Sequence, residues 1–86
     1  MPRKHTRLQI NERKLGRSKA WGQYYDNIIE IDPRATPYQY LGTLIHELLH
    51  HCFPYMSETK VTRVAKTITC GVWSKQFRRT EEKSGV

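Results

Sequence analysis

Apolar and polar residues follow different periods in the two halves of this 86-residue chain. From residue 36 onwards the apolar positions recur three and four residues apart, which is the spacing of one helix face. Between residues 20 and 31 short apolar runs are bounded by turn-forming residues, as in β-strands. The pattern predicts an α+β domain in which a short β-hairpin, within a small antiparallel sheet, precedes two packed helices.

The N-terminal half predicts a hairpin and one further strand. The hairpin strands are residues 20–25 and 28–31, and Asp26-Asn27 forms a two-residue turn because both residue types tolerate positive φ. Asp32-Pro33 ends the second strand, since proline cannot donate a hydrogen bond to the ladder. Residues 8–10 are predicted as the further short strand.

The first predicted helix begins after Thr36 and ends at Phe53-Pro54. Thr36 is a good N-cap, and Pro37 suits the first helical position because its missing N–H would be unpaired there anyway. The helix presents a broad apolar surface, made by Leu41, Leu44, Ile45, Leu48, Leu49 and Cys52.

The second predicted helix begins after Ser57, another good N-cap. Its apolar positions form one stripe, made by Val61, Val64, Ala65, Ile68 and Val72. Trp73 and Phe77 extend this stripe, and the polar residues 80–86 are predicted to fray as a disordered tail. The predicted organisation is a basic N-terminal arm over residues 1–19, a folded domain over residues 20–79, and that tail.

Composition indicates a small cytoplasmic protein. Mean hydropathy is −0.75, and no apolar run approaches the roughly 20 residues that cross a bilayer. The basic N-terminus lacks the apolar stretch of a secretory signal, so we expect a cytoplasmic location and no membrane partner. Cys52 and Cys70 are expected to be free thiols packed as small hydrophobes.

The net charge of +7 is unevenly distributed. Residues 1–19 and 58–79 are strongly basic, whereas the segment between them is neutral to acidic. Such segments can bind nucleic acid or an acidic partner, and they can equally form a solvated basic surface. Lys60, Arg63 and Lys66, on the exposed side of the last helix, are the candidate nucleic-acid contacts.

The strongest chemical signal is His46-Glu47-Leu48-Leu49-His50, an HExxH motif within a predicted helix. Residues four apart lie on one helix face, so both imidazoles can bind one metal ion, for which zinc is the expected choice. Glu47 then lies beside the open coordination position, where it can accept a proton from water on the metal. The motif therefore predicts a metal site with Glu47 as the catalytic base.

A third metal ligand must come from elsewhere in the chain. Glu58 is favoured because it lies in the first turn of the last helix, on the side shared with Val61 and Ala65, which must pack against the motif helix. The alternative is that Glu58 only complements the helix dipole. The rival ligands, which point elsewhere or lie on distant segments, are His51, Cys52, His5, Glu81 and Glu82.

Two further roles remain open at the level of sequence. Tyr55 and His51 are both candidates to stabilise the transition state or to support the metal ligands. A hairpin strand, either Tyr24-Tyr25 or residues 28–31, can pair with an extended peptide substrate by strand addition. The same hairpin can instead simply cover the apolar faces of the helices.

The motif and its surroundings resemble a known group of proteins. Residues 46–61, HELLHHCFPYMSETKV, are similar to small gluzincin-type zinc metalloproteases and to compact phage or prokaryotic proteins of the SprT-like kind. The matching order is a strand hairpin, the run IDPR at residues 31–34, the HELLH helix, a proline-containing loop and Ser-Glu opening the last helix. The resemblance covers residues 20–75 and implies a minimal zincin core. It also implies zinc bound by His46, His50 and Glu58, with Glu47 as the base.

The chain differs from these families in two respects. Glu58 lies closer to the second histidine than the glutamate ligand of many gluzincins does, and the third histidine and zinc ribbon of SprT-like proteases are missing. The resemblance therefore points to the wider zincin group rather than to one subfamily.

Three functions follow as hypotheses. The first is a zinc-dependent metallopeptidase that hydrolyses peptide bonds of a protein or peptide substrate. The second is a DNA-associated protein that binds through its basic segments. The third is a non-catalytic protein in which zinc staples two helices together and the surface binds nucleic acid or a partner protein.

Overall fold

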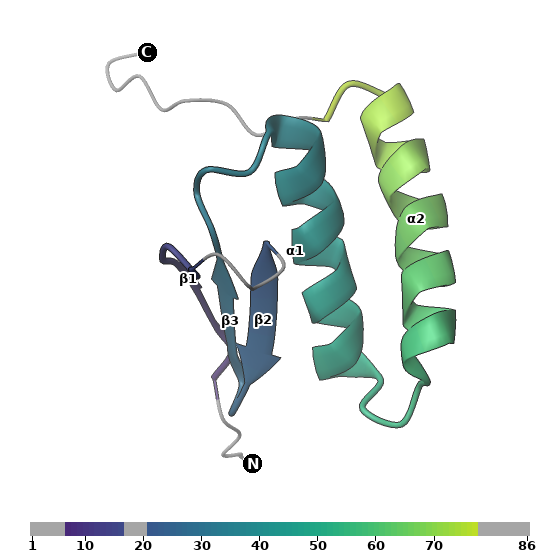
Figure 1. Ribbon diagram of the computed structural model, residues 1–86. Helices are drawn as coiled ribbons and strands as arrows, with labels where there is room; N and C mark the ends of the chain where they lie inside the picture. The colour runs from purple at the N-terminus through teal and green to yellow at the C-terminus, as the bar shows by residue number, and fades with distance from the viewer. Residues whose placement is uncertain (1–6, 17–20, 78–86) are drawn as a thin grey trace.

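The computed structural model describes residues 7–16 and 21–77, which form a three-stranded sheet followed by two helices (Figure 1). The α+β class predicted from the sequence is confirmed. The elements are β1 (Gln9–Glu12), β2 (Gly22–Tyr25), β3 (Ile28–Ile31), α1 (Pro37–Cys52) and α2 (Glu58–Ser74). The sheet, α1 and α2 lie side by side with α1 in the middle (Figure 1). The predicted tail and the rival ligands His5, Glu81 and Glu82 lie outside the described residues.

The predicted hairpin is present, and the sheet around it is mixed. β2 and β3 pair antiparallel, and Asp26 and Asn27 take φ values of 49° and 63°, as a two-residue turn requires. β1 pairs in parallel with β3, because the chain crosses from β1 to the far edge of the sheet before the hairpin begins. The antiparallel pairing predicted from the sequence is therefore correct for the hairpin and wrong for β1. β1 also brings residues 9–12 of the basic segment 1–19 into the sheet.

Both helices begin where the sequence predicted. The Thr36 hydroxyl accepts from the backbone N–H of Gln39, whose side chain accepts from the N–H of Thr36, so the two form a capping box. The Ser57 hydroxyl accepts from the N–H of Lys60 in the same way. Within the described residues, neither helix combines the length and the apolar character that crossing a membrane requires.

The core has two parts, one on each side of α1. Ile29 and Ile31 of β3 are fully buried on the face that packs against α1. Between the helices Leu49, Val61 and Ala65 are buried, with further apolar side chains of both helices packed around them. Of the predicted stripe of α2, Val61, Val64 and Ala65 therefore pack against α1, whereas Ile68 is exposed.

Two sequence predictions about apolar residues were wrong. Phe77 does not extend the stripe, because Gln76 takes a left-handed φ of 71° after α2 has ended, and 69% of Phe77 is exposed. Cys52 and Cys70 are free thiols as expected, yet both are exposed rather than packed inside. Cys52 is the last residue of α1, and the Sγ of the exposed Cys70 in α2 lies 3.6 Å from the Tyr38 hydroxyl of α1.

Asp32 follows β3 and is almost completely buried. It hydrogen-bonds to the chain segment that follows β1. Its carboxylate accepts from the Arg34 side chain at 2.6 and 2.9 Å, and from the backbone N–H groups of Arg34 at 2.9 Å and Leu15 at 3.1 Å. The Arg34 guanidinium holds the pKa of Asp32 well below its usual value; burial opposes this, and the two backbone donors reinforce it. The charged form of Asp32 is therefore part of the folded structure.

We expect Asp32→Asn to lower the thermal midpoint of unfolding at neutral pH by several degrees, because the buried N–H of Leu15 and the Arg34 guanidinium lose a charged acceptor. A lowered pKa means that the stabilisation is present above the unfolded-state pKa of about 4 and is lost as the pH falls below it. The variant should therefore lose less stability than the wild type between neutral and acidic pH. Thermal unfolding followed by circular dichroism over that range tests this, and parallel pH curves would contradict it.

Gly22 sets the close approach of β2 to α1. A Cβ added there would overlap the Thr43 methyl group and lie 3.1 Å from the carbonyl oxygen of Glu30. We expect Gly22→Ala to lower the free energy of unfolding by about 1–3 kcal/mol, the usual effect of overpacking. Adding Thr43→Ala should recover part of this loss in chemical denaturation. An equal loss in the single and double variants would show that the overlap with Thr43 is not the cause.

Candidate metal centre

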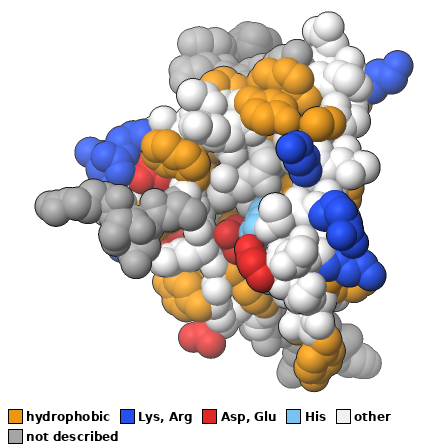
Figure 2. Space-filling model, turned by 45° about the vertical axis from the view of Figure 1, so that its right-hand side comes forward, with side chains coloured by type: hydrophobic (Ala, Val, Ile, Leu, Met, Phe, Trp, Pro, Cys, Tyr) orange, Lys and Arg blue, Asp and Glu red, His pale blue; other side chains and the backbone are white. Residues whose placement is uncertain are grey.

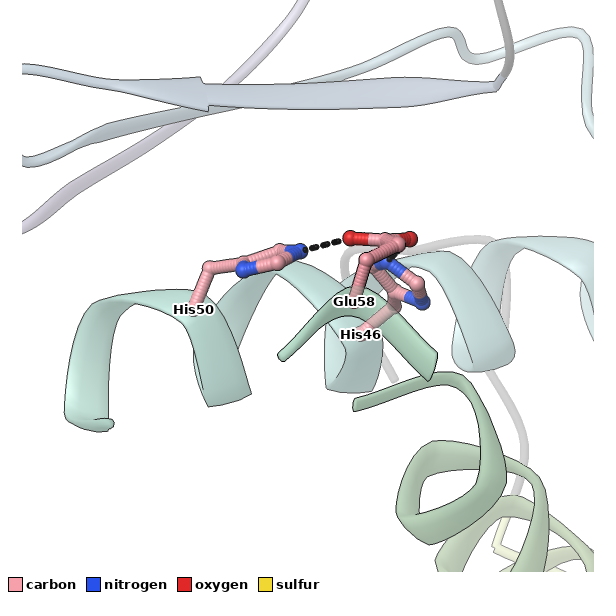
Figure 3. Close-up of side chains that lie close together, drawn as sticks. All are labelled: His46, His50 and Glu58. Atoms are coloured by element: carbon pink, nitrogen blue, oxygen red, sulfur yellow. Dashed lines mark ion pairs between the residues drawn. The ribbon is translucent and has the colours of Figure 1, made fainter. Parts of the chain in front are cut away.

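His46, His50 and Glu58 bring three metal-binding side chains together at the start of α2. His46 Nε2 lies 3.0 Å from one carboxylate oxygen of Glu58, and His50 Nε2 lies 2.8 Å from the other. Figure 3 shows the two imidazoles of α1 and the carboxylate of α2 turned towards one another. Among the described residues, these are the ones that form a group able to hold a metal ion, with ligand atoms within 4.8 Å of one another.

The spacing of these atoms fits zinc. Zinc bonds to imidazole nitrogen and carboxylate oxygen are about 2.0–2.2 Å long, so tetrahedral coordination places two ligand atoms roughly 3.3 Å apart. The nitrogen–oxygen separations of 3.0 and 2.8 Å need only a small opening to meet this value. Two imidazoles and one carboxylate are also a common donor set of catalytic zinc sites, which keep one position open.

Helix geometry positions the two candidate histidine ligands, and the packing of α2 on α1 positions Glu58. His46 and His50 share a face because they are four apart within α1. Glu58 is the first residue of α2, and the loop over residues 53–57 reverses the chain so that Val61 and Ala65 pack against α1. This packing turns the first turn of α2 towards the histidines.

Glu47 lies next to the metal-binding group but points towards the sheet. Its exposed fraction is 9%, and a Cβ added at Gly22 in β2 would lie 3.6 Å from its Cγ. Burial raises the pKa of Glu47 above its usual value; His46 and His50 oppose this rise, and the negative charge of Glu58 adds to it. A buried carboxyl with a raised pKa is suited to accept and return a proton.

A cavity of about 410 Å³ connects these groups. Its wall includes His46, Glu47 and Glu58, together with the aromatic side chains of Trp21 and Tyr38. Figure 2 shows histidine and acidic side chains next to each other in the middle of the face to which α2 contributes. The candidate base and two of the three candidate metal ligands therefore share one solvent-accessible space.

No protein-family model, curated protein or solved structure matches this chain. The resemblance to gluzincin-type and SprT-like proteins thus rests on the motif and on the order of elements around it. What the site can do must be inferred from its own geometry.

The structure places the two candidate transition-state residues away from the cavity. The Tyr24 hydroxyl lies 2.9 Å from Nδ1 of His51, which links the end of α1 to β2. Tyr55 is 99% exposed in the loop between the helices and lines a different hollow. Neither residue is among those that line the cavity at the metal-binding group.

The three candidate nucleic-acid contacts on α2 are all exposed. Lys60 lines the hollow around Tyr55, whereas Lys66 lines a hollow beside His46. Nucleic-acid binding through these residues stays a prediction.

The sheet order decides which hairpin strand has a free edge. β3 lies between β1 and β2 and is paired on both sides, so residues 28–31 cannot accept another strand. β2 is an edge strand within the described part of the chain, and it packs against α1 beside Glu47. Of the two strands considered from sequence, only β2 can pair with a peptide.

Trp21, Tyr38 and Gly42 line the cavity and were not predicted as site residues. Helical periodicity could have indicated two of them, because Gly42 and Tyr38 lie four and eight residues before His46 on the same side of α1. Trp21 had no such signal, since only the packing of the sheet on α1 brings it there.

Proposed function

We propose that this chain is a zinc-dependent peptidase in which His46, His50 and Glu58 hold the metal. The observation that carries the proposal is one cavity whose wall holds His46 and Glu58, two members of the three-donor metal group, together with the buried Glu47 carboxyl. A purely structural metal site has no need of a cavity or of a base with a raised pKa beside it. Both features are typical of hydrolytic sites.

Glu47 is the general base in this proposal. Bound zinc supplies Lewis acidity and makes water a nucleophile near neutral pH. Glu47 accepts the proton of that water and returns it to the amine that leaves, and its raised pKa suits both transfers. The partly buried imidazoles keep their orientation because α1 is packed on two sides.

The open edge of β2 supports a peptide as the substrate. An extended chain that pairs with β2 runs past Gly22, whose missing side chain leaves the backbone close to Glu47. The aromatic walls formed by Trp21 and Tyr38 offer apolar contact to substrate side chains. A protein or peptide substrate in extended conformation therefore fits this surface.

Incubation of the zinc-loaded protein with a peptide library, followed by mass spectrometry, tests the proposal. We expect defined cleavage products that disappear when a chelator removes the metal and return when zinc is added. A fully zinc-loaded protein that cleaves no member of the library would contradict the proposed catalysis. It would favour the alternative of a zinc-stapled binding protein.

A further inference from the structure

A second hollow of about 240 Å³ lies directly beside the metal-binding group, between α1 and α2. It shares Tyr38, Gly42 and His46 with the larger cavity, so the two spaces adjoin along α1. On the side of α2 it is lined by Thr62, Lys66 and Thr69. None of these three residues has a role in the proposed proton transfers.

Thr69 carries a buried hydroxyl with no partner. The residue is 3% exposed, and among the described residues its Oγ1 is the buried side-chain polar atom that has no hydrogen bond. Buried hydroxyls normally find a partner, and one that lines a hollow can find it in a bound ligand. Gly42 lies across from this hydroxyl on α1, where an added Cβ would lie 3.7 Å from Thr69 Oγ1.

Lys66 adds an uncompensated positive charge to the same hollow. It lines the hollow and is exposed, and no ion pair within the described residues includes it. Glu58, in the first turn of the same helix, is engaged with His46, His50 and the Thr62 hydroxyl. Figure 2 shows Lys and Arg side chains on the same face as the histidine and acidic group.

We propose that this hollow is a subsite that binds a carboxylate of the peptide held at the metal centre. A carboxylate oxygen is an acceptor for the unpaired Thr69 hydroxyl, and its charge complements the Lys66 ammonium. The carboxylate is either the C-terminus of the peptide or an Asp or Glu side chain next to the cleaved bond. The inference rests on the proposed function for its ligand, a peptide, and predicts that acidic peptides are the preferred substrates.

Peptide binding to the zinc-loaded Glu47→Gln variant tests the subsite without requiring cleavage. The probes are fluorescein-labelled hexapeptide pools of three kinds: glutamate-containing with an amidated C-terminus, glutamine-containing with an amidated C-terminus, and glutamine-containing with a free C-terminus. By fluorescence anisotropy we expect one carboxylate-bearing pool to bind roughly tenfold or more tightly than the neutral pool. The pool that does so identifies the source of the carboxylate.

Three substitutions on this background assign the preference to residues. Lys66→Gln should abolish the preference for carboxylate-bearing peptides. Thr69→Val removes the hydroxyl but keeps the shape of the side chain. It should reduce this preference several-fold without lowering the thermal midpoint of unfolding. Lys60→Gln is the matched control, since Lys60 is an exposed lysine of the same helix that lines a different hollow. It should leave the preference unchanged.

Equal binding of all pools, no binding of any pool, or equal effects of Lys60→Gln and Lys66→Gln would each overturn the subsite. A different result would show that the proposed peptidase function is wrong. If the wild type cleaves no peptide but the carboxylate preference persists and depends on Lys66, the subsite stands and the peptidase proposal falls. If the wild type cleaves peptides without any preference for carboxylates, the peptidase proposal stands and the subsite falls.

Discussion

Substitution of Glu47 by glutamine is expected to slow peptide cleavage by about 10³-fold or more while zinc remains bound. Glutamine has the shape of glutamate but cannot accept a proton, and general bases contribute about 10²–10⁴-fold to such reactions. Because burial raises the pKa of Glu47, the ionised carboxylate is not favoured by folding, so a neutral side chain should not lower stability. The variant separates proton transfer from metal binding.

The measurement is kcat/KM on a peptide that the wild type cleaves, with the zinc content determined on the same samples. Glu47→Asp is the matched control, since it keeps a carboxylate but withdraws it by one methylene, and part of the activity should survive. Full activity of Glu47→Gln would exclude Glu47 as the base. Loss of zinc from this variant would instead assign Glu47 to metal binding.

Zinc is expected to raise the free energy of unfolding by about 4 kcal/mol when its concentration is 1,000 times its Kd. A bound metal would add a second link between α2 and the rest of the fold, since α2 packs against α1 but, among the described elements, makes no contact with the sheet. His46 and His50 come from α1 and Glu58 from α2, so a bound metal joins the two helices at the end where the chain reverses. This link would add to the apolar packing of α2 on α1.

Chemical denaturation with zinc and with a chelator measures this increment. His46→Ala and His50→Ala should lose most of it, because each removes one of three protein ligands. His51→Ala is the adjacent control: it should destabilise the protein through the lost contact with Tyr24 yet retain the zinc increment. If His50→Ala kept the same increment as the wild type, zinc would not bind at the proposed group.

Several features could be predicted from the sequence because they depend on near neighbours in the chain. Thr36 and Ser57 begin the helices since their side chains accept from N–H groups three residues on. Asp26 and Asn27 form the hairpin turn through their own φ preferences. The two histidines of the motif share a face through helical periodicity alone.

Other features of the fold and the site were decided by contacts between distant segments. The direction of β1 and the central position of β3 depend on how the chain crosses the sheet, which strand patterns do not encode. The sequence suggested Tyr55 and His51 as supporting residues by proximity, but the structure puts Trp21, Tyr38 and Gly42 around the cavity instead. Which side chains share a cavity depends on the packing of whole elements.

By itself, then, the sequence determined that His46 and His50 share one helix face with Glu47 beside them, and where the two helices begin, because the geometry of one helix is local and regular. Only the tertiary structure brought Glu58 within 3.0 Å of both imidazoles, buried Glu47 against β2 and left the Thr69 hydroxyl unpaired beside Lys66. These arrangements arise where α1 packs between the sheet and α2. The fit of three elements, rather than any short run of residues, sets the distances there.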